Sequence, residues 1–508
     1  MIKLIYRIES DYMSKKRMLI VTSVTLSVVT ISLGIVKLYQ TYALSNYIGT
    51  VTDTGIDVYI NDDSYASIPA NGSSNVYYML TNTNPGTVKY GVAYQTTSGV
   101  TVKVYDTSED PATGTIEEND KKYIKLHLEN KNSTNKTIEL STVLGYENGG
   151  DLVVPSGVTL VTDTYTPPPT AAEYITKLYT TASKTTVTNN SITYNTAPSV
   201  SLMNDRLGGT TTDLDGGNIR YYGASPNNYI YFNCSDYSNQ TSSTCETWRI
   251  IGVFDGKLKL IRGSQIGTYS WDNKDTSTGA ESNFGKNDWT TARLMKLLNP
   301  DDYYINDNND KDSEGNYLGY SLYYNSASGM CFTDEGVNYS ACDFTSTGIK
   351  NDETRNMIAE TTYNLGGWND TGVYPNEIYE YERGTTVYTG RPTTWTGKIA
   401  LAYPSDYGYA ADLNQCKDKT LYDYNNSTCT SNNWMKAIIT NNGSNSGWLL
   451  TPYCSTSSNV WYVYPVGNVY FNYTVYSAFG AVPVLSLSSK LGIESGDGSS
   501  SNPYKLSA

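Results

Sequence analysis

The chain has 508 residues, too many for one ordinary core, so we expect two or three domains. It carries 36 Lys and Arg against 50 Asp and Glu, a formal net charge of -14. This balance argues against nucleic acid as a partner, because a phosphate-binding face needs clustered basic residues. Tyrosine dominates the aromatic residues, with 48 copies against seven Phe and eight Trp, so much of the aromatic surface carries a hydroxyl group.

The N-terminal segment indicates where in the cell the protein is located. An uncharged apolar run over Met18–Val36 directly follows three basic residues and is about long enough for one membrane helix of roughly 20 residues. Because positive flanks stay inside, we predict a cytoplasmic tail over 1–17 and a transmembrane signal anchor over 18–38. We expect a single pass through the cell membrane, with the C-terminal domains extracellular. A cleaved signal peptide is the alternative.

Residues 46–165 show the alternation of β-strands. Apolar residues recur at every second position in "VKYGVAY" (88–94), "VTVKVY" (100–105) and "YIKLHLE" (123–129). Short alternating runs separated by turn residues predict an all-β Ig-like sandwich. The sole histidine, His127, alternates with apolar neighbours, so we place it on the solvent face without a function.

A Pro-containing linker and a short helix are expected over 166–199, the helix in "AAEYITKLYTTA". The remainder, 200–508, holds all Trp and Cys residues and predicts a loop-rich α+β domain. Within it we expect a hairpin turning at Asp255–Gly256 and a helix in "DWTTARLMKLLN" that Asp288 caps. A second helix is expected in "NDETRNMIAETTYNL", before a Gly pair.

Six of the seven cysteines fall into local pairs separated by ten, ten and twelve residues, without any C-x-x-C spacing. Metal sites prefer closer thiols and His partners. We therefore predict three disulfide-closed loops, Cys234–Cys245, Cys331–Cys342 and Cys416–Cys429, with Cys454 left over. The acidic residues at 310–315 resemble the start of a calcium loop, but Ser321 stands where the bidentate Glu belongs. No metal and no cofactor are predicted.

The segment 453–479 holds nine aromatic residues among Ser, Thr and Asn, and no charged residue lies between Lys436 and Lys490. Antibody paratopes use the same residue types, because Tyr combines rigid contact area with a polar tip. Alternation predicts that Trp461 points inward and Tyr462 outward. The predicted ligand-binding residues are Tyr453, Cys454, Tyr462, Tyr464, Tyr470, Asn472, Tyr473, Tyr476 and Phe479.

Several long runs carry a family resemblance: "NNYIYFNCSDYSNQTSSTCETWRIIGVFDGKLKLIR" (227–262), "YERGTTVYTGRPTTWTGKIALAYPSDYGYA" (381–410), "WLLTPY" and "GDGSSSNPYKL". The chain resembles an uncharacterised family of surface proteins from low-GC Gram-positive bacteria. Its C-terminal pattern is similar to C-type-lectin-like domains of the formylglycine-generating-enzyme branch. That branch includes receptors varied by a diversity-generating retroelement. The resemblance implies a C-type-lectin-like ligand-binding domain over 200–508, in which Val482 replaces an Arg usual in the family.

We therefore predict a multidomain, membrane-anchored cell-surface protein that is not an enzyme. Its partners would be an extracellular protein or glycan ligand and the membrane, with no nucleic acid. One alternative is an extracellular carbohydrate-active enzyme that uses two carboxylates, and another is a structural envelope protein. The candidate carboxylates are Asp288, Glu353, Glu377, Glu380 and Asp406.

Overall fold

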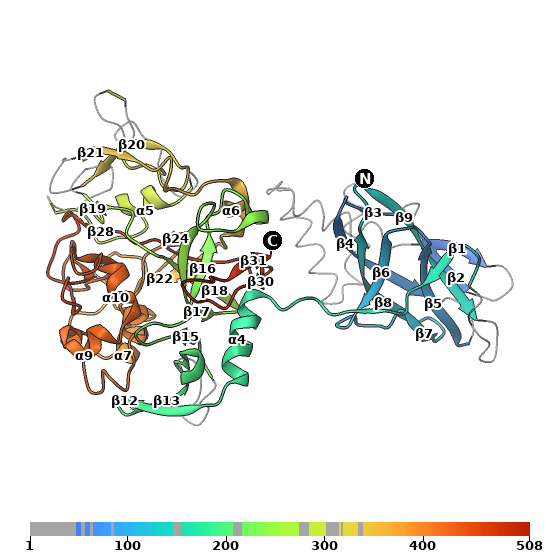
Figure 1. The fold of residues 1–508 in the computed structure, drawn as a ribbon, viewed down its shortest axis with the longest axis horizontal. Coiled ribbons are helices and arrows are strands. Elements are labelled where there is room, and N and C mark those ends of the chain that lie inside the picture. Colours follow the sequence, from blue (N-terminus) through green and yellow to red (C-terminus); the bar gives the residue numbers. More distant parts are fainter. Residues whose placement is uncertain are drawn as a thin grey trace, which may run out of the picture. The chain divides into compact units, whose positions relative to one another are not determined.

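The chain divides at Pro168/Pro169 into two compact units, Met1–Pro168 and Pro169–Ala508 (Figure 1). A computed structural model describes residues 47–51, 56–60, 65–82, 86–145, 152, 154–206, 216–273, 284–300, 314–315, 318–333 and 339–507. Sheet predominates in both units, and the helices are short.

The first unit is a sandwich of two sheets, with orders β10-β5-β9-β3 and β11-β6-β8-β4; β7 pairs with β5 outside the first path. A separate hairpin joins β1 and β2. The strands are β1 (Tyr47–Val51), β2 (Ile56–Ile60), β3 (Tyr65–Ile68), β4 (Gly72–Thr81), β5 (Val88–Gln95), β6 (Val100–Tyr105), β7 (Thr113–Ile116), β8 (Lys121–Asn130), β9 (Lys136–Gly145), β10 (Val158–Leu160) and β11 (Thr164–Tyr165).

The core of the sandwich follows the alternation in the sequence. On β8, Ile124, Leu126 and Leu128 are fully buried and belong to the same apolar cluster as Val92 of β5. Strand side chains point to opposite faces in turn, so the alternating residues line the space between the sheets. The strands predicted from this pattern are confirmed.

The prediction that His127 faces solvent is wrong. Its side chain is only 8% exposed, because Tyr165 of β11 stacks on the imidazole with ring centroids 3.6 Å apart. Its Nδ1 also lies 2.8 Å from the amide oxygen of Asn75. Burial lowers the pKa of His127. Strand β11 pairs in parallel with β6 and so extends this sheet at its edge, which places the Tyr165 ring over His127 on the outer face.

The second unit contains two larger sheets, with orders β12-β13-β14-β15-β17-β18-β29-β24, where β16 also pairs with β17, and β19-β28-β25-β26-β27. Three two-stranded pairs, β20–β21, β22–β23 and β30–β31, complete its sheet structure in the described residues. The strands are β12 (Thr185–Asn189), β13 (Ile192–Ala197), β14 (Leu202–Asn204), β15 (Ile219–Tyr221), β16 (Tyr229–Phe232), β17 (Glu246–Phe254), β18 (Lys257–Arg262), β19 (Thr268–Tyr269), β20 (Ser328–Phe332), β21 (Tyr339–Asp343), β22 (Thr361–Asn364), β23 (Thr394–Gly397), β24 (Ile399–Ala400), β25 (Gly447–Pro452), β26 (Val460–Val463), β27 (Val469–Tyr470), β28 (Phe479–Gly480), β29 (Val484–Ser486), β30 (Gly492–Ser495) and β31 (Lys505–Ser507).

The predicted hairpin between β17 and β18 is confirmed. Its two turn residues, Asp255 and Gly256, have φ angles of 48° and 70°, the left-handed values that a tight two-residue turn requires. Further along β17, a Cβ at Gly252 would lie 2.1 Å from the carbonyl oxygen of Ile219. The absence of a side chain at this position therefore lets β15 pair closely with β17.

The helices of the second unit are short, and two of them differ from prediction. The helices are α4 (Ala171–Thr181), α5 (Arg293–Leu298), α6 (Asp352–Met357), α7 (Pro375–Glu382), α8 (Pro404–Tyr409), α9 (Ser427–Ser431) and α10 (Trp434–Ile439). The predicted helix α4 is confirmed, and Thr170 caps it through a capping box. Asp288 does not cap α5, because its carboxylate accepts from the amide of Thr290 in a preceding turn. Similarly, α6 ends at Met357, and β22 follows where helix was expected.

The predicted fold class and membrane location require correction. No helix in the described part of the chain is long and apolar enough to cross a bilayer. The predicted tail over 1–17 and anchor over 18–38 lie outside the described residues. The single-pass transmembrane prediction is therefore not supported, whereas the sheet-rich content agrees with the β-structure predicted from the sequence.

Candidate ligand-binding surface

The segment 453–479 is built on the sheet that contains β25, β26 and β27. Strand β26 lies between the other two, with Tyr462 opposite Trp448 on one side and Tyr470 on the other. The fully buried side chains of Trp461, Val463 and Val469 pack into one apolar cluster. These three residues form a rigid base for the loops that follow the strands.

Tyr462 was predicted to point outward, and this is wrong. It is 1% exposed and belongs to a second apolar cluster on the opposite face of the sheet from Trp461. Because an interior strand can be buried on both faces, alternation here separates two cores and does not separate core from solvent. The hydroxyl of Tyr462 donates to the amide oxygen of Asn472, and burial raises its pKa.

The other predicted residues lie at or near the surface. Tyr464 is 41% exposed and Tyr473 is 42% exposed, and Asn472 is exposed between strands. The partly exposed residues are Tyr453, Cys454, Tyr470, Tyr476 and Phe479. Apart from Tyr462, the predicted set therefore remains accessible to some degree.

The structure adds exposed residues that the sequence analysis missed. Tyr422, 46% exposed, lies with its ring centroid 5.6 Å from that of Tyr470. Val466 is 53% exposed in the loop between β26 and β27. We call the following residues the aromatic surface: Tyr422, Tyr464, Val466, Tyr470 and Tyr473. Tyr422 lies in the Cys416–Cys429 loop, and no local pattern in the sequence places it beside residue 470.

Ring contacts connect this surface to the core. The buried ring of Tyr462 lies 6.3 Å from Tyr464, 6.4 Å from Tyr470 and 5.4 Å from Tyr473, measured between centroids. Nearby, Phe284 stacks on Tyr476 with centroids 5.6 Å apart. Edge and offset contacts of this kind fix ring orientation, so the exposed rings are held in defined positions.

The three predicted disulfides, Cys234–Cys245, Cys331–Cys342 and Cys416–Cys429, are confirmed. Among the described residues, Cys454 has the one free thiol. It is half-buried, and burial raises its pKa, which disfavours the reactive thiolate. The disulfides fit an oxidising compartment.

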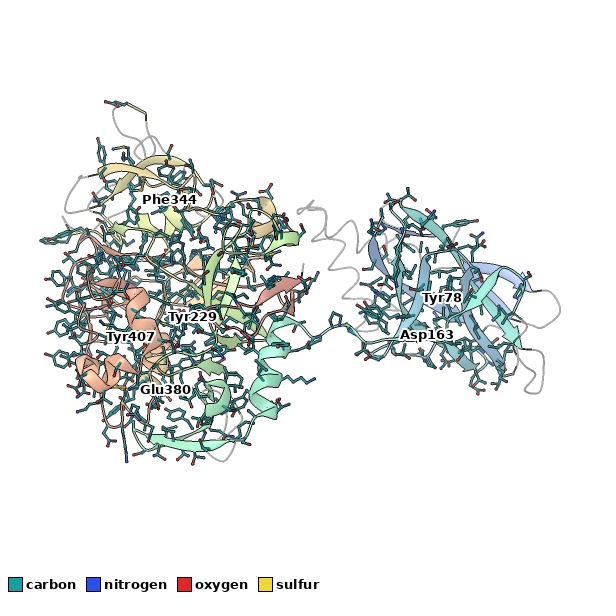
Figure 2. The ribbon with its side chains drawn as sticks, in the orientation of Figure 1. Tyr78, Asp163, Tyr229, Phe344, Glu380 and Tyr407 are labelled. Carbon is teal, nitrogen blue, oxygen red and sulfur yellow. A yellow bond between two sulfur atoms is a disulfide. The ribbon has the colours of Figure 1, made fainter. Side chains whose placement is uncertain are left out.

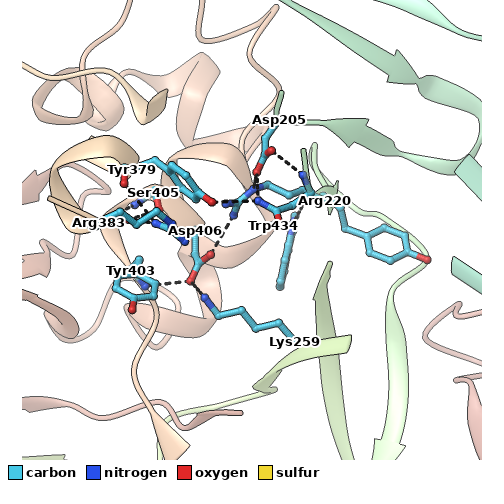
Figure 3. A network of polar contacts seen from close by, with 12 residues as sticks. Asp205, Arg220, Lys259, Tyr379, Arg383, Tyr403, Ser405, Asp406 and Trp434 are labelled. Carbon is cyan, nitrogen blue, oxygen red and sulfur yellow. Dashed lines mark hydrogen bonds and ion pairs between the residues drawn. The ribbon is translucent and has the colours of Figure 1, made fainter. Parts of the chain in front are cut away.

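Some charged residues of this unit lie in the core, where they form an ionic network (Figure 3). Arg220 of β15 bonds Asp205 through Nε at 2.5 Å and Asp406 of α8 through Nη1 at 3.0 Å. Lys259 of β18 bonds the second carboxylate oxygen of Asp406. Burial opposes the ionisation of Asp406, but Lys259 and Arg220 outweigh it and lower its pKa. The network ties α8 to the large sheet.

The carboxylates considered for catalysis serve other contacts or lie apart on the surface. Asp406 is held in the ionic network, and Glu377 accepts from the amide of Tyr374 at the start of α7. Asp288 stabilises its own turn, while Glu353 and Glu380 are exposed. The described residues contain no group of three or more His, Cys, Asp and Glu side chains that could hold a metal ion. Most of the acidic run at 310–315 lies outside the described residues.

Comparison with known proteins returned no match: no family model, no curated protein and no solved structure is similar to this chain. The resemblance stated from the sequence therefore stays a prediction, and the C-type-lectin-like fold that it implies has no structural neighbour in support.

Proposed function

We propose that the second unit is a binding module that recognises another macromolecule, in the first place a protein, through the aromatic surface. The observation that supports this most strongly is the group of exposed rings on the charge-free segment between Lys436 and Lys490, which Tyr422 joins from the Cys416–Cys429 loop. The described residues expose ten large apolar or aromatic side chains, and four of these lie on the aromatic surface. Contiguous exposed apolar patches on soluble domains mark interaction sites.

The composition of the surface favours recognition over catalysis. Tyr supplies a large contact area at low entropic cost, and Asn and Ser around it supply adaptable hydrogen bonds. The rings are held by contacts with Tyr462 below them, so little ordering is required when a partner binds. Pre-organisation of this kind raises affinity, because fewer rotamers are frozen during association.

Ring geometry favours a protein partner over a glycan. A sugar ring stacks on a free, flat aromatic face, but Tyr470 stacks on Phe471 with an interplanar angle of 14° and also contacts Tyr422. Side chains presented at mixed angles match the uneven surface of a protein, where Tyr is enriched at hot spots. A glycan ligand is therefore the competing outcome of the test.

The test uses the full chain as a probe of two arrays, one of purified secreted proteins and one of glycans. The variant Tyr422→Ser/Tyr464→Ser/Tyr473→Ser removes three exposed rings and leaves Tyr462 in place. If each ring contributes about 1 to 2 kcal/mol, as interface hot spots do, we expect binding to specific array proteins to fall by at least 100-fold.

A matched control removes exposed tyrosines elsewhere. Tyr65, Tyr123 and Tyr339 are 51%, 41% and 38% exposed, so Tyr65→Ser/Tyr123→Ser/Tyr339→Ser removes comparable surface. This control should bind as the unaltered chain does. Equal binding by both triple variants contradicts the proposed surface, and binding confined to the glycan array contradicts the protein assignment.

We also propose, from the sequence resemblance, that 453–479 varies among clones of the source organism. The structure sharpens the test, because Trp461 and Val463 are fully buried whereas Tyr464 and Tyr473 are exposed. Clonal resequencing should find substitutions at the exposed positions and none at the buried pair. Substitutions spread evenly over both sets, or an invariant segment, contradict directed variation.

A further inference from the structure

A second candidate site, which shares no residue with the aromatic surface, is a pocket of about 420 Å³ beside β16, β17 and β18. Tyr229, labelled in Figure 2, belongs to its wall. Thr247 and Arg249 of β17 also line it, as does Ser264, which follows β18. Small-molecule sites have volumes of this order and carry a few placed polar groups.

The cation of this pocket has no anionic partner. Arg249 is 7% exposed, and no carboxylate in the described part of the chain lies within ion-pair distance of it. Its Nε donates to the amide oxygen of Asn228 at 2.5 Å, and Nη2 donates to the carbonyl oxygen of Pro226 at 3.3 Å. Both acceptors are neutral, so the positive charge is uncompensated, and Nη1 makes no hydrogen bond with described residues.

Aromatic rings hold the guanidinium in place. Its central carbon lies 3.7 Å from the ring centroid of Tyr229 and 4.9 Å from that of Trp434. Cation–π contacts of this kind stabilise a guanidinium in a partly desolvated position while leaving its edge available for hydrogen bonds. Burial lowers the pKa of Arg249 to about 10, so the side chain remains charged at neutral pH.

The other charges at this pocket cancel. Arg262 bonds Glu246 through two parallel contacts, Nε to Oε2 at 3.0 Å and Nη2 to Oε1 at 3.1 Å. Glu246 also accepts from the indole of Trp248 at 3.1 Å. This pair is electrically neutral, and the net charge of the lining is therefore the single positive charge of Arg249.

Hydroxyl groups supply the remaining donors. The side chain of Thr247 is exposed and makes no hydrogen bond with described residues. The oxygen of Ser264 accepts from Arg262 at 2.9 Å, which leaves the hydroxyl hydrogen free to donate. The hydroxyl of Tyr229 also has no partner among the described residues. One guanidinium with several hydroxyl donors suits a singly charged acceptor group, because a hydroxyl can donate to an oxyanion without adding charge.

We propose that this pocket binds a small ligand bearing one carboxylate, which accepts hydrogen bonds from Arg249 and from the hydroxyls around it. The carboxylate would come from an acidic sugar or from the end of a peptide. The proposal does not depend on the aromatic surface, since the two sites share no residue. Loss of one activity should leave the other intact.

The binding test uses the full chain with two carboxylate probes, D-glucuronate and N-acetylalanine, and their neutral counterparts, methyl glucoside and N-acetylalanine amide. Saturation-transfer NMR and titration calorimetry at low and physiological salt measure binding. We expect one of the carboxylates to bind and its neutral counterpart to bind at least tenfold more weakly. The probe that binds identifies the source of the carboxylate. Equal binding of charged and neutral members, or no binding by either acid, overturns the proposal.

Two variants shift the charge of the pocket in opposite directions. Arg249→Met keeps an apolar side chain between the rings and should weaken binding at least tenfold. Glu246→Gln releases the charge of Arg262 and should strengthen binding at least threefold. Lys490→Met removes one exposed positive charge elsewhere and should change nothing. If Arg249→Met and Lys490→Met bind alike, the site is not built on Arg249.

A milder variant keeps the proposal testable if Arg249→Met does not fold. Thr247 and Ser264 are exposed, so Thr247→Val/Ser264→Ala removes two hydroxyl donors at the rim without altering the core. This rim variant should bind the carboxylate probe three- to tenfold more weakly. The matched control Thr362→Val/Ser340→Ala, whose two residues are also exposed, should bind the probe as the unaltered chain does. Unchanged affinity in the rim variant contradicts the role of the hydroxyls.

Discussion

Within the second unit, the ionic network and the aromatic surface invert the usual distribution of side chains. Asp205, Arg220 and Asp406 are at most 2% exposed, while Tyr464 and Tyr473 are more than 40% exposed. The buried ions pair with one another and attach a helix to a sheet, so removing one should cost stability. The exposed rings leave much of their surface in solvent, so removing one should cost recognition more than stability. Four measurements test this contrast.

The largest effect is expected from Asp406→Asn. This change leaves Lys259 without its carboxylate partner in the core, and breaking a buried ion pair costs about 3 to 5 kcal/mol. Urea denaturation of the full chain measures the loss. The matched control is Asp352→Asn, because the Asp352 side chain is 90% exposed in its ion pair with Arg355 and should lose less than about 1 kcal/mol. Similar losses in both variants would show that the buried network contributes no special stability.

The next effect concerns the loop that carries Tyr422. Replacing Cys416 and Cys429 with Ala opens that loop, and the free energy of unfolding should fall by about 3 kcal/mol under the loop-entropy estimate. Thiol titration of the unfolded, unreduced wild type should find the single thiol of Cys454. A stability equal to wild type would mean that packing alone holds the loop.

The third measurement concerns pH. Burial raises the pKa of Glu382 to about 7 from its usual value of about 4.5. Between pH 4.5 and 7 the Glu382 carboxyl group therefore keeps its proton in the folded state and loses it in the unfolded state. As a result, the free energy of unfolding falls as pH rises over this range. Below pH 4.5 the group is neutral in both states. Glu382→Gln should remove this decline and stabilise the chain above pH 7 by at most about 3 kcal/mol.

Denaturant titrations at several pH values between 4 and 8 check this prediction. Asp272 is also buried with its pKa raised to about 7, so the variant retains part of the pH dependence. The informative quantity is the difference between variant and wild type. A difference that does not change between pH 4.5 and 7 would contradict the protonated state of Glu382.

The smallest expected effect on stability distinguishes the buried ring of Tyr462 from the exposed ring of Tyr464. Tyr462→Phe removes the hydroxyl that bonds Asn472 and should cost about 1 kcal/mol. Tyr464→Phe should cost almost nothing, because its exposed hydroxyl makes no hydrogen bond with described residues. Thermal denaturation of the two variants provides the comparison. A larger loss at Tyr464 would reverse the assignment of the two rings.

The sequence predicted elements whose signals are local. Alternation over 88–129 predicted strands that the structure confirms, and Asp255–Gly256 predicted the turn between β17 and β18. The three disulfides followed from cysteine spacing, because six cysteines fall into local pairs and none has the C-x-x-C spacing of a metal site. In each case the information lies within about fifteen residues.

The errors concern contacts between distant segments. His127 is covered by Tyr165, and Tyr462 is buried because β26 has a core on each face; alternation cannot reveal what lies over a strand. Tyr422 reaches Tyr470 from a separate loop. The ionic network likewise joins Arg220 to a carboxylate 186 positions away. No spacing rule covers such a distance.

The charge-free character of the aromatic surface also bears on solubility. The network's paired ions cancel, so the formal charge of -14 resides on other side chains and makes copies of the chain repel one another in dilute buffer. At 1 M salt the screening length shrinks to about 3 Å, and that repulsion disappears while attraction between uncharged rings persists. Ionic strength should therefore govern whether concentrated solutions of this protein stay dispersed or self-associate.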